Sequence, residues 1–137
     1  MADLTVTAAS VLFTSGTKIT NYNAGETITA GMGVYLKASD SELYKAQCDG
    51  TSAEATAVGI ALHAAGDGQP LAYAADNSTI NIGATTSKAT TYMVAATAGG
   101  VAPQADLTSG QYITRLGYAT ATDGTFKVDI AVTGATV

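Results

Sequence analysis

Short segments with a period of two, each bounded by turn residues, constrain this chain more than any other feature. The stretch FKVDIAV at residues 126–132 places a large apolar residue at every second position, which is the pattern of a half-buried β-strand. Asp123-Gly124 stands just before it. Because both residues tolerate positive φ, this pair predicts a tight hairpin with the preceding segment QYITRLGYATA.

Further strand-like segments recur at short intervals along the chain, separated by Gly, Asp, Asn and Ser. The clearest are VGIALHA from Val58, PLAYAA from Pro70, TINIGA from Thr79 and TYMVAA from Thr91. A single helical turn is expected in residues 49–57. Near the start, DLTVTA and SVLFTSG either pair as strands or belong to an extended arm that orders only on a partner.

Many short strands must close into a barrel or stack as a sandwich, since open sheet edges invite aggregation. We therefore expect an all-β fold, a compact β-barrel or β-sandwich of short antiparallel strands. Residues 1–20 are expected to form an N-terminal arm or edge strands, and residues 21–137 a single β domain.

Glycines cluster in AGETITAGMGVYLKA, residues 24–38. A phosphate-binding loop requires a helix directly after its glycines, whereas here the strand-forming residues Val34 and Tyr35 follow and no P-loop lysine is present. We interpret the cluster as a turn between strands. The pattern T-x-G-x-x-[VI] occurs at Thr29 and again at Thr108, and we interpret it as repeated turn chemistry.

Composition limits both the core and the partners. The chain has 137 residues with no Trp and only two Phe, so the core should be thin, which favours an oligomer or binding to a larger assembly. The net charge is −5 and the six basic residues are scattered, so direct nucleic-acid binding is not expected. The sequence has neither a membrane-length apolar run nor the features of a secretion signal, and we expect synthesis in the cytoplasm.

Residues capable of catalysis or metal binding are few. His63 is the only histidine and Cys48 the only cysteine, too few soft ligands for a structural zinc site. Asp40 and Glu42 alternate in ASDSELYKA, and either an acid/base pair, a calcium site or a solvated turn fits them. We favour a strand-end role for His63, a small buried side chain for Cys48 and a turn for the two carboxylates. No enzyme activity, cofactor or metal is predicted.

The succession of segments resembles the small capsid decoration, or cement, proteins of tailed bacteriophages. The resemblance covers roughly residues 24–120. It rests on G-E-x-I-x-A-G, on V-G-I-A-L followed by a G-Q-P loop, and on T-Y…G-G-x-A-P…G…I-T-x-L-G. It implies a non-enzymatic β protein, often a homotrimer, that is assembled in the host cytoplasm and binds the major capsid protein on the outer surface of the expanded head.

For capsid contact we nominate five apolar residues near the N-terminus whose local partners the sequence does not identify: Leu4, Val6, Val11, Leu12 and Phe13. The main alternative function is a glycan-binding β module of a virion fibre or similar surface structure, with some of the seven tyrosines as stacking platforms. Packing in the core and at subunit contacts is the favoured interpretation of those tyrosines. An enzyme using His63 or the Asp40/Glu42 pair ranks third.

Overall fold

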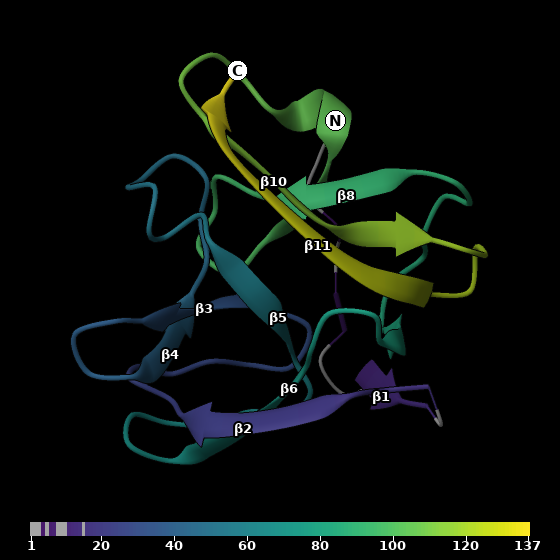
Figure 1. Ribbon diagram of the computed structural model, residues 1–137. Coiled ribbons are helices and arrows are strands. Elements are labelled where there is room, and N and C mark those ends of the chain that lie inside the picture. Colours follow the sequence, from purple (N-terminus) through teal and green to yellow (C-terminus); the bar gives the residue numbers. More distant parts are fainter. Residues whose placement is uncertain (1–3, 5, 8–10, 15) are drawn as a thin grey trace.

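The chain folds as a sandwich of two antiparallel β-sheets (Figure 1). The computed structural model describes residues 4, 6–7, 11–14 and 16–137. Within these residues the only helix is a single 3₁₀ turn, η2 (Gln104–Asp106). The predicted all-β fold class is therefore confirmed.

The first sheet has six strands, in the spatial order β1 (Val11–Phe13), β7 (Thr79–Ile82), β11 (Thr125–Thr136), β10 (Tyr112–Ala119), β8 (Thr91–Val94) and β9 (Val101–Pro103). The second has five, in the order β2 (Ile19–Asn23), β6 (Pro70–Ala74), β5 (Ala57–Ala61), β3 (Gly33–Lys37) and β4 (Glu42–Lys45). The four central segments predicted as strands correspond to β5, β6, β7 and β8.

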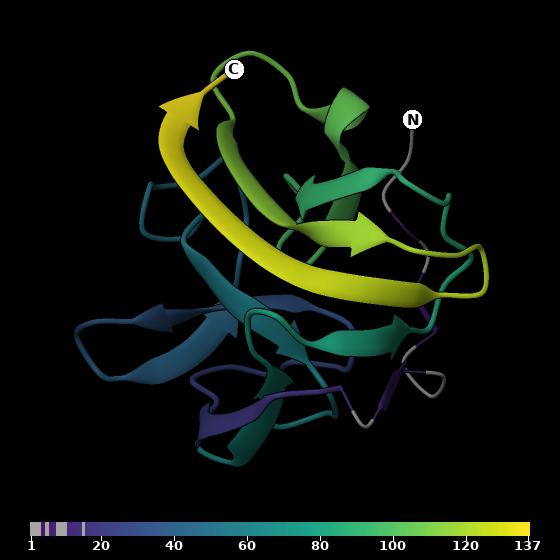
Figure 2. The same ribbon diagram turned by 45° about the vertical axis from the view of Figure 1, so that its right-hand side comes forward.

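The predicted C-terminal hairpin contains the two longest strands of the described chain, β10 with 8 residues and β11 with 12. β10 and β11 pair antiparallel, and Figure 2 shows β11 as one long curved strand running beside β10. Gly124 in the turn has a φ of 96°, and Asp123 Oδ1 accepts hydrogen bonds from the backbone N–H and the hydroxyl of Thr125 at 3.1 and 2.6 Å. The hairpin itself is therefore confirmed, but Asp123 does not share the positive φ of Gly124 and residues 120–124 connect the strands, so the connection is longer than a two-residue Asp-Gly turn.

The repeated T-x-G pattern forms two turns of the same kind. Gly31 and Gly110 have φ values of 86° and 88°. In each turn the next N–H donates to the carbonyl of the threonine, Thr29 or Thr108, at 3.4 and 3.1 Å. Positive φ at the third turn residue favours glycine strongly. No helix follows Gly31, and β3 begins at Gly33, so the interpretation of the glycine cluster as a strand-connecting turn is confirmed.

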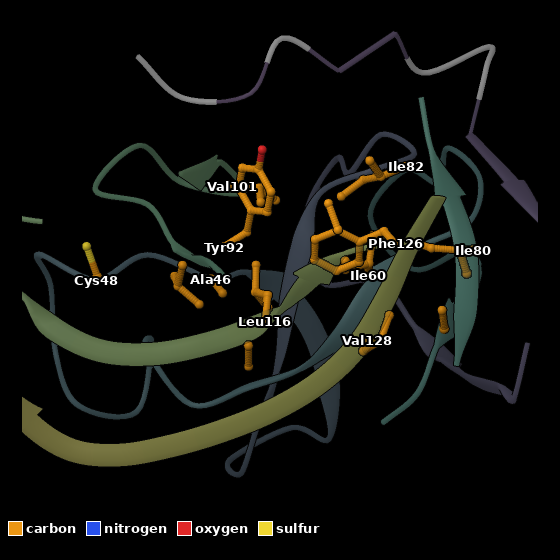
Figure 3. Packing of buried hydrophobic residues seen from close by; sticks show 14 residues of the cluster. Ala46, Cys48, Ile60, Ile80, Ile82, Tyr92, Val101, Leu116, Phe126 and Val128 are labelled. Carbon is orange, nitrogen blue, oxygen red and sulfur yellow. The ribbon is translucent and has the colours of Figure 1, made fainter. Parts of the chain in front are cut away.

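The main hydrophobic core lies between the two sheets and centres on Phe126, the largest fully buried side chain. Its ring centroid lies 5.9 Å from that of Tyr92, and Ile60 from the other sheet belongs to the same cluster. Figure 3 shows these side chains gathered in one group, with Cys48 at one end. Cys48 is fully buried, which confirms its interpretation as a small buried side chain.

A second, smaller core forms because the five-stranded sheet curls. Ala24, directly after β2, makes a parallel bridge to Leu43 of β4, and Ile28 makes an antiparallel bridge to Ala65. The buried residues enclosed by this curl are Ala24, Ile28, Val34, Leu43, Ala61, Ala65, Leu71 and Tyr73. The fold is thus a sandwich in which one of the two sheets is partly rolled.

The described part of the N-terminal segment lies against the domain. β1 pairs with β7 at the edge of the six-stranded sheet, and among the described residues it does not pair with Leu4, Val6 or Thr7 of DLTVTA. The N–H groups of Leu4 and Thr7 donate to the carbonyls of Val101 and Gly83 at 2.7 and 2.8 Å. The expected boundary at residue 20 falls inside β2, which begins at Ile19.

The expected helical turn in residues 49–57 forms as an isolated turn. The N–H of Ala55 donates to the carbonyl of Thr51 at 3.3 Å, and residues 52–55 are turn in character. The N–H of Thr51 donates to Glu54 Oε1 at 3.0 Å, and its hydroxyl lies 3.1 Å from the same atom. This carboxylate fixes the loop between β4 and β5.

Gly117 gives a direct test of the packing between β10 and β11. The register shifts between Arg115 and Gly117 against both neighbouring strands, and a Cβ at Gly117 would clash with the backbone carbonyl of Lys127. We expect Gly117→Ala to lower the free energy of unfolding by about 2–3 kcal/mol, the upper part of the range of overpacking, because the clash is with backbone; urea denaturation measures this change.

Gly16→Ala is the matched control for this prediction. An added Cβ there meets Thr79 at an ordinary 3.5 Å, so its effect should stay within about 1 kcal/mol. Equal stabilities of the two variants would contradict the packing described for Gly117.

Candidate interaction surface

Two edge strands that follow one another in the sequence carry three of the four most exposed large apolar side chains among the described residues, the fourth being Val137. Phe13 and Leu12 on β1 are 67% and 59% exposed, and Ile19 at the start of β2 is 50% exposed. β1 ends the six-stranded sheet and β2 ends the five-stranded sheet. We call the surface formed by Phe13 and Ile19 the β1–β2 rim, because Leu12, next to Phe13 in β1, points to the opposite face of the sheet.

Strand register places two of these side chains at the open margin of the main core. Phe13 pairs with Ile80 of β7, and paired residues in antiparallel strands share a sheet face. Ile19 pairs with Ala74, which in turn pairs with Ile60. Ile80 and Ile60 are both fully buried in the main core. Phe13 and Ile19 therefore extend the two inner faces of the sandwich into solvent.

Side-chain hydrogen bonds fix the connection between β1 and β2. The hydroxyls of Thr14 and Thr17 both donate to the carbonyl of Thr79, at 2.6 and 2.8 Å. Ser78, which is fully buried, accepts a hydrogen bond from the N–H of Lys18 at 2.8 Å. The two edge strands are thus fastened to the start of β7, and the rim is held in place.

The five residues nominated for capsid contact divide into two groups. Leu12 and Phe13 are exposed, with Phe13 on the rim and Leu12 on the opposite face of β1. Val11 is only 7% exposed, while Leu4 and Val6 pack partly buried against the main core and line a cavity of about 240 Å³. The sequence analysis did not nominate Ile19. The segment TKITNYN, residues 17–23, follows a turn and is rich in the strand-forming types Thr, Ile and Tyr. This composition could have indicated an edge strand that contains Ile19.

The segment containing the rim is poor in charge. Lys18 is the only residue between positions 4 and 25 whose side chain carries a formal charge at neutral pH. The whole chain, by contrast, has a net charge of −5. Charged residues are depleted in the buried centre of protein interfaces. The chemistry of this segment therefore suits burial against another protein.

The Asp40 carboxylate organises the hairpin between β3 and β4. Asp40 Oδ1 accepts a hydrogen bond from the N–H of Glu42 at 3.0 Å, and Oδ2 accepts one from the Tyr44 hydroxyl at 2.7 Å. The hydrogen bond between these side chains raises the pKa of Tyr44 to about 12 and lowers the pKa of Asp40. The solvated-turn interpretation of this stretch matches this geometry.

His63 lies exposed, two residues after β5 ends at Ala61. Its Nε2 accepts a hydrogen bond from the N–H of Ala72 at 3.0 Å, and Nδ1 lies 2.9 Å from the carbonyl oxygen of Ala64. An acceptor role for Nε2 assigns the proton to Nδ1, which donates to that carbonyl. Both ring nitrogens serve local backbone contacts, as expected for a polar strand-end residue.

The tyrosines are distributed between the core and several parts of the surface. Tyr73 and Tyr92 are buried, whereas Tyr22 and Tyr118 are exposed. Tyr35 and Tyr44 form the one close tyrosine pair within the described residues, with ring centroids 6.0 Å apart. Core packing accounts for some of these residues, and no single face gathers all of them.

No group of three or more His, Cys, Asp or Glu side chains suited to a metal ion is present in the described part of the chain. Across the same residues, no helix has the length and apolar character needed to cross a membrane. The sequence matches no known protein-family model and no curated protein.

The Asp40–Tyr44 hydrogen bond predicts a pH dependence at alkaline pH. Because the folded pKa of Tyr44 is about 12, above about 10 for an unfolded tyrosine, the contribution of this bond to stability is complete below about pH 10. It is lost as the pH rises through the folded pKa. Asp40→Asn should lower the pKa of Tyr44 toward about 10.

The measurement is a tyrosinate absorbance titration, with Tyr44→Phe subtracted to isolate Tyr44. Asp123→Asn is the matched control, since Asp123 is a turn carboxylate in the other long hairpin. A Tyr44 titration that does not change in Asp40→Asn would contradict the assigned hydrogen bond.

Proposed function

We propose that this chain is a capsid decoration protein that binds the outer surface of an expanded phage head and stabilises it by bridging major capsid protein subunits. The observation that carries the proposal is the β1–β2 rim, where Phe13 and Ile19 expose apolar surface at the margin of the main core. The sequence resemblance over residues 24–120 supports the same function, as does the all-β fold.

The energetic logic of the proposal starts with the thin core. Few large side chains are available to fill it, and two large apolar ones at its margin remain in water. Burying them against a capsid subunit removes that apolar surface from solvent, at roughly 25 cal/mol per Å². The capsid contact would thus complete the open margin of the sandwich.

Bridging follows from multivalency. A homotrimer that contacts neighbouring capsid subunits gains effective concentration once its first contact has formed, so each individual contact needs only modest affinity. Separating two capsid subunits then requires breaking the added contacts as well. No cofactor or chemical step takes part in this mechanism.

Substitutions on the rim test the proposal without disturbing the fold. Phe13→Ser and Ile19→Ser remove exposed side chains, so the stability of the free protein should change by no more than about 1 kcal/mol. Each should weaken binding to expanded capsids by at least about tenfold, because loss of a hot-spot anchor, the role assigned to these two residues, costs about 2 kcal/mol or more, and about 1.4 kcal/mol already corresponds to a factor of ten. The assay is cosedimentation with expanded capsids of the encoding phage that lack this component.

Val132→Ser is the matched control, since Val132 is 43% exposed but lies on β11. Point substitutions are preferable to removal of the N-terminal segment, because β1 pairs with β7 and Val11 is buried. Absence of saturable binding by the unaltered protein would overturn the proposed function. Saturable binding that is insensitive to both rim substitutions would show that the rim is not the capsid contact.

A further inference from the structure

A second surface feature lies away from the rim. An open cleft of about 540 Å³ separates the end of β3 from the loop between β4 and β5, a volume within the usual range for small-ligand sites. Its lining includes Tyr35, Leu36, Lys37, Thr51, Ala53 and Glu54. In Figure 1, β3 and β4 lie at the left and β1 at the right, so the cleft and the rim occupy separate parts of the molecule.

Local backbone irregularity and hydrogen bonds shape the cleft. The pairing of β3 with β5 shifts register between Val34 and Tyr35, and such bulges commonly redirect a side chain beside a binding site. On the opposite wall, Gln47 Nε2 donates to Glu54 Oε2 at 2.9 Å, while the N–H of Thr51 donates to Oε1. Glu54 is therefore already fixed in position, without a ligand.

The charges of the lining favour a neutral ligand. Lys37 contributes one positive charge and Glu54 one negative charge, and the other lining residues carry none. Lys37 Nζ lies 4.9 Å from the ring centroid of Tyr44, and this contact holds the ammonium group beside the cleft. A lining with one cation and one anion offers both a donor and an acceptor but does not select for a phosphate or a metal cation.

The uncharged lining is partly apolar and partly hydroxylated. Leu36 and Ala53 provide apolar surface, Thr51 provides a hydroxyl, and Tyr35 provides an aromatic ring with a hydroxyl at its end. Burial, followed by the nearby negative charges of Glu54, Glu26 and Asp40, raises the pKa of Tyr35. The Tyr35 hydroxyl therefore stays protonated at neutral pH and is able to donate a hydrogen bond.

We propose that this cleft binds one or two units of a saccharide chain. A sugar ring combines an apolar face, which packs on an aromatic side chain, with hydroxyl groups that both donate and accept hydrogen bonds. Tyr35 would supply the packing surface, Lys37 a donor and Glu54 an acceptor. The proposal is independent of capsid binding, and a chain attached to a capsid through the rim would leave the cleft open to solvent.

Two-dimensional NMR of the isolated ¹⁵N-labelled protein provides the test. Maltotriose, chitotriose, mannotriose and cellotriose are the probes. Saturable shifts of the amide signals of residues 35–38 and 51–56 are expected with at least one probe. Lys37→Ala should weaken that binding by about tenfold, the effect of losing one hydrogen bond from a charged group, while the exposed control Tyr118→Ala should leave it unchanged.

Tyr35→Leu supplies a second variant, because it keeps apolar packing against the main core and removes the aromatic ring and hydroxyl. It should also weaken binding. Absence of saturable shifts with all four probes would overturn the proposal, as would shifts confined to other residues or binding unaffected by both cleft substitutions. Lys37→Ala should still cosediment with capsids normally, so failure of this inference is distinguishable from failure of the decoration function.

Discussion

Packing of Phe126 between the two sheets is the interaction on which the rest of the structure depends. This side chain reaches Tyr92 on its own sheet and shares a cluster with Ile60 of the opposite sheet. With only two Phe and no Trp in the chain, few other residues can fill the space. The sandwich is closed around Phe126 but leaves Phe13, the other phenylalanine, at the margin in solvent.

The position of Phe13 follows from strand register. β1 has only three residues, yet its pairing with β7 places Phe13 opposite a buried isoleucine. An edge strand of this kind, with an apolar side chain at the core margin, is a liability for a protein that acts alone. It becomes useful if another protein covers it, and this is the central physical argument for the proposed capsid contact.

Local sequence patterns predicted much of the fold. Asp123-Gly124 and the alternation after it predicted the β10–β11 hairpin, and the T-x-G pattern predicted the turns at Gly31 and Gly110. These features depend on φ preferences and on period-two burial, which act over a few residues. The curl of the five-stranded sheet was not predictable in this way, because it depends on a bridge between Ala24 and Leu43, which belong to different strand-turn units.

The candidate surfaces were only partly predictable for the same reason. Apolar character alone could not separate Leu4, Val6 and Val11, which pack on the domain, from Leu12 and Phe13, which remain exposed. Ile19 is exposed near Phe13 because β1 and β2, the edge strands of two different sheets, lie on the same side of the molecule. The cleft beside Tyr35 requires the turn that carries Glu54, which the sequence did predict, and the register shift on β3, which has no local sequence signature.

Amide hydrogen exchange of the protein, free and bound to expanded capsids, tests the central claim most directly. If the β1–β2 rim is the capsid contact, exchange should slow on binding in residues 11–23, and residues 51–56 beside the cleft should exchange as in the free protein. Unchanged exchange in residues 11–23, with protection elsewhere on the sandwich, would contradict the account.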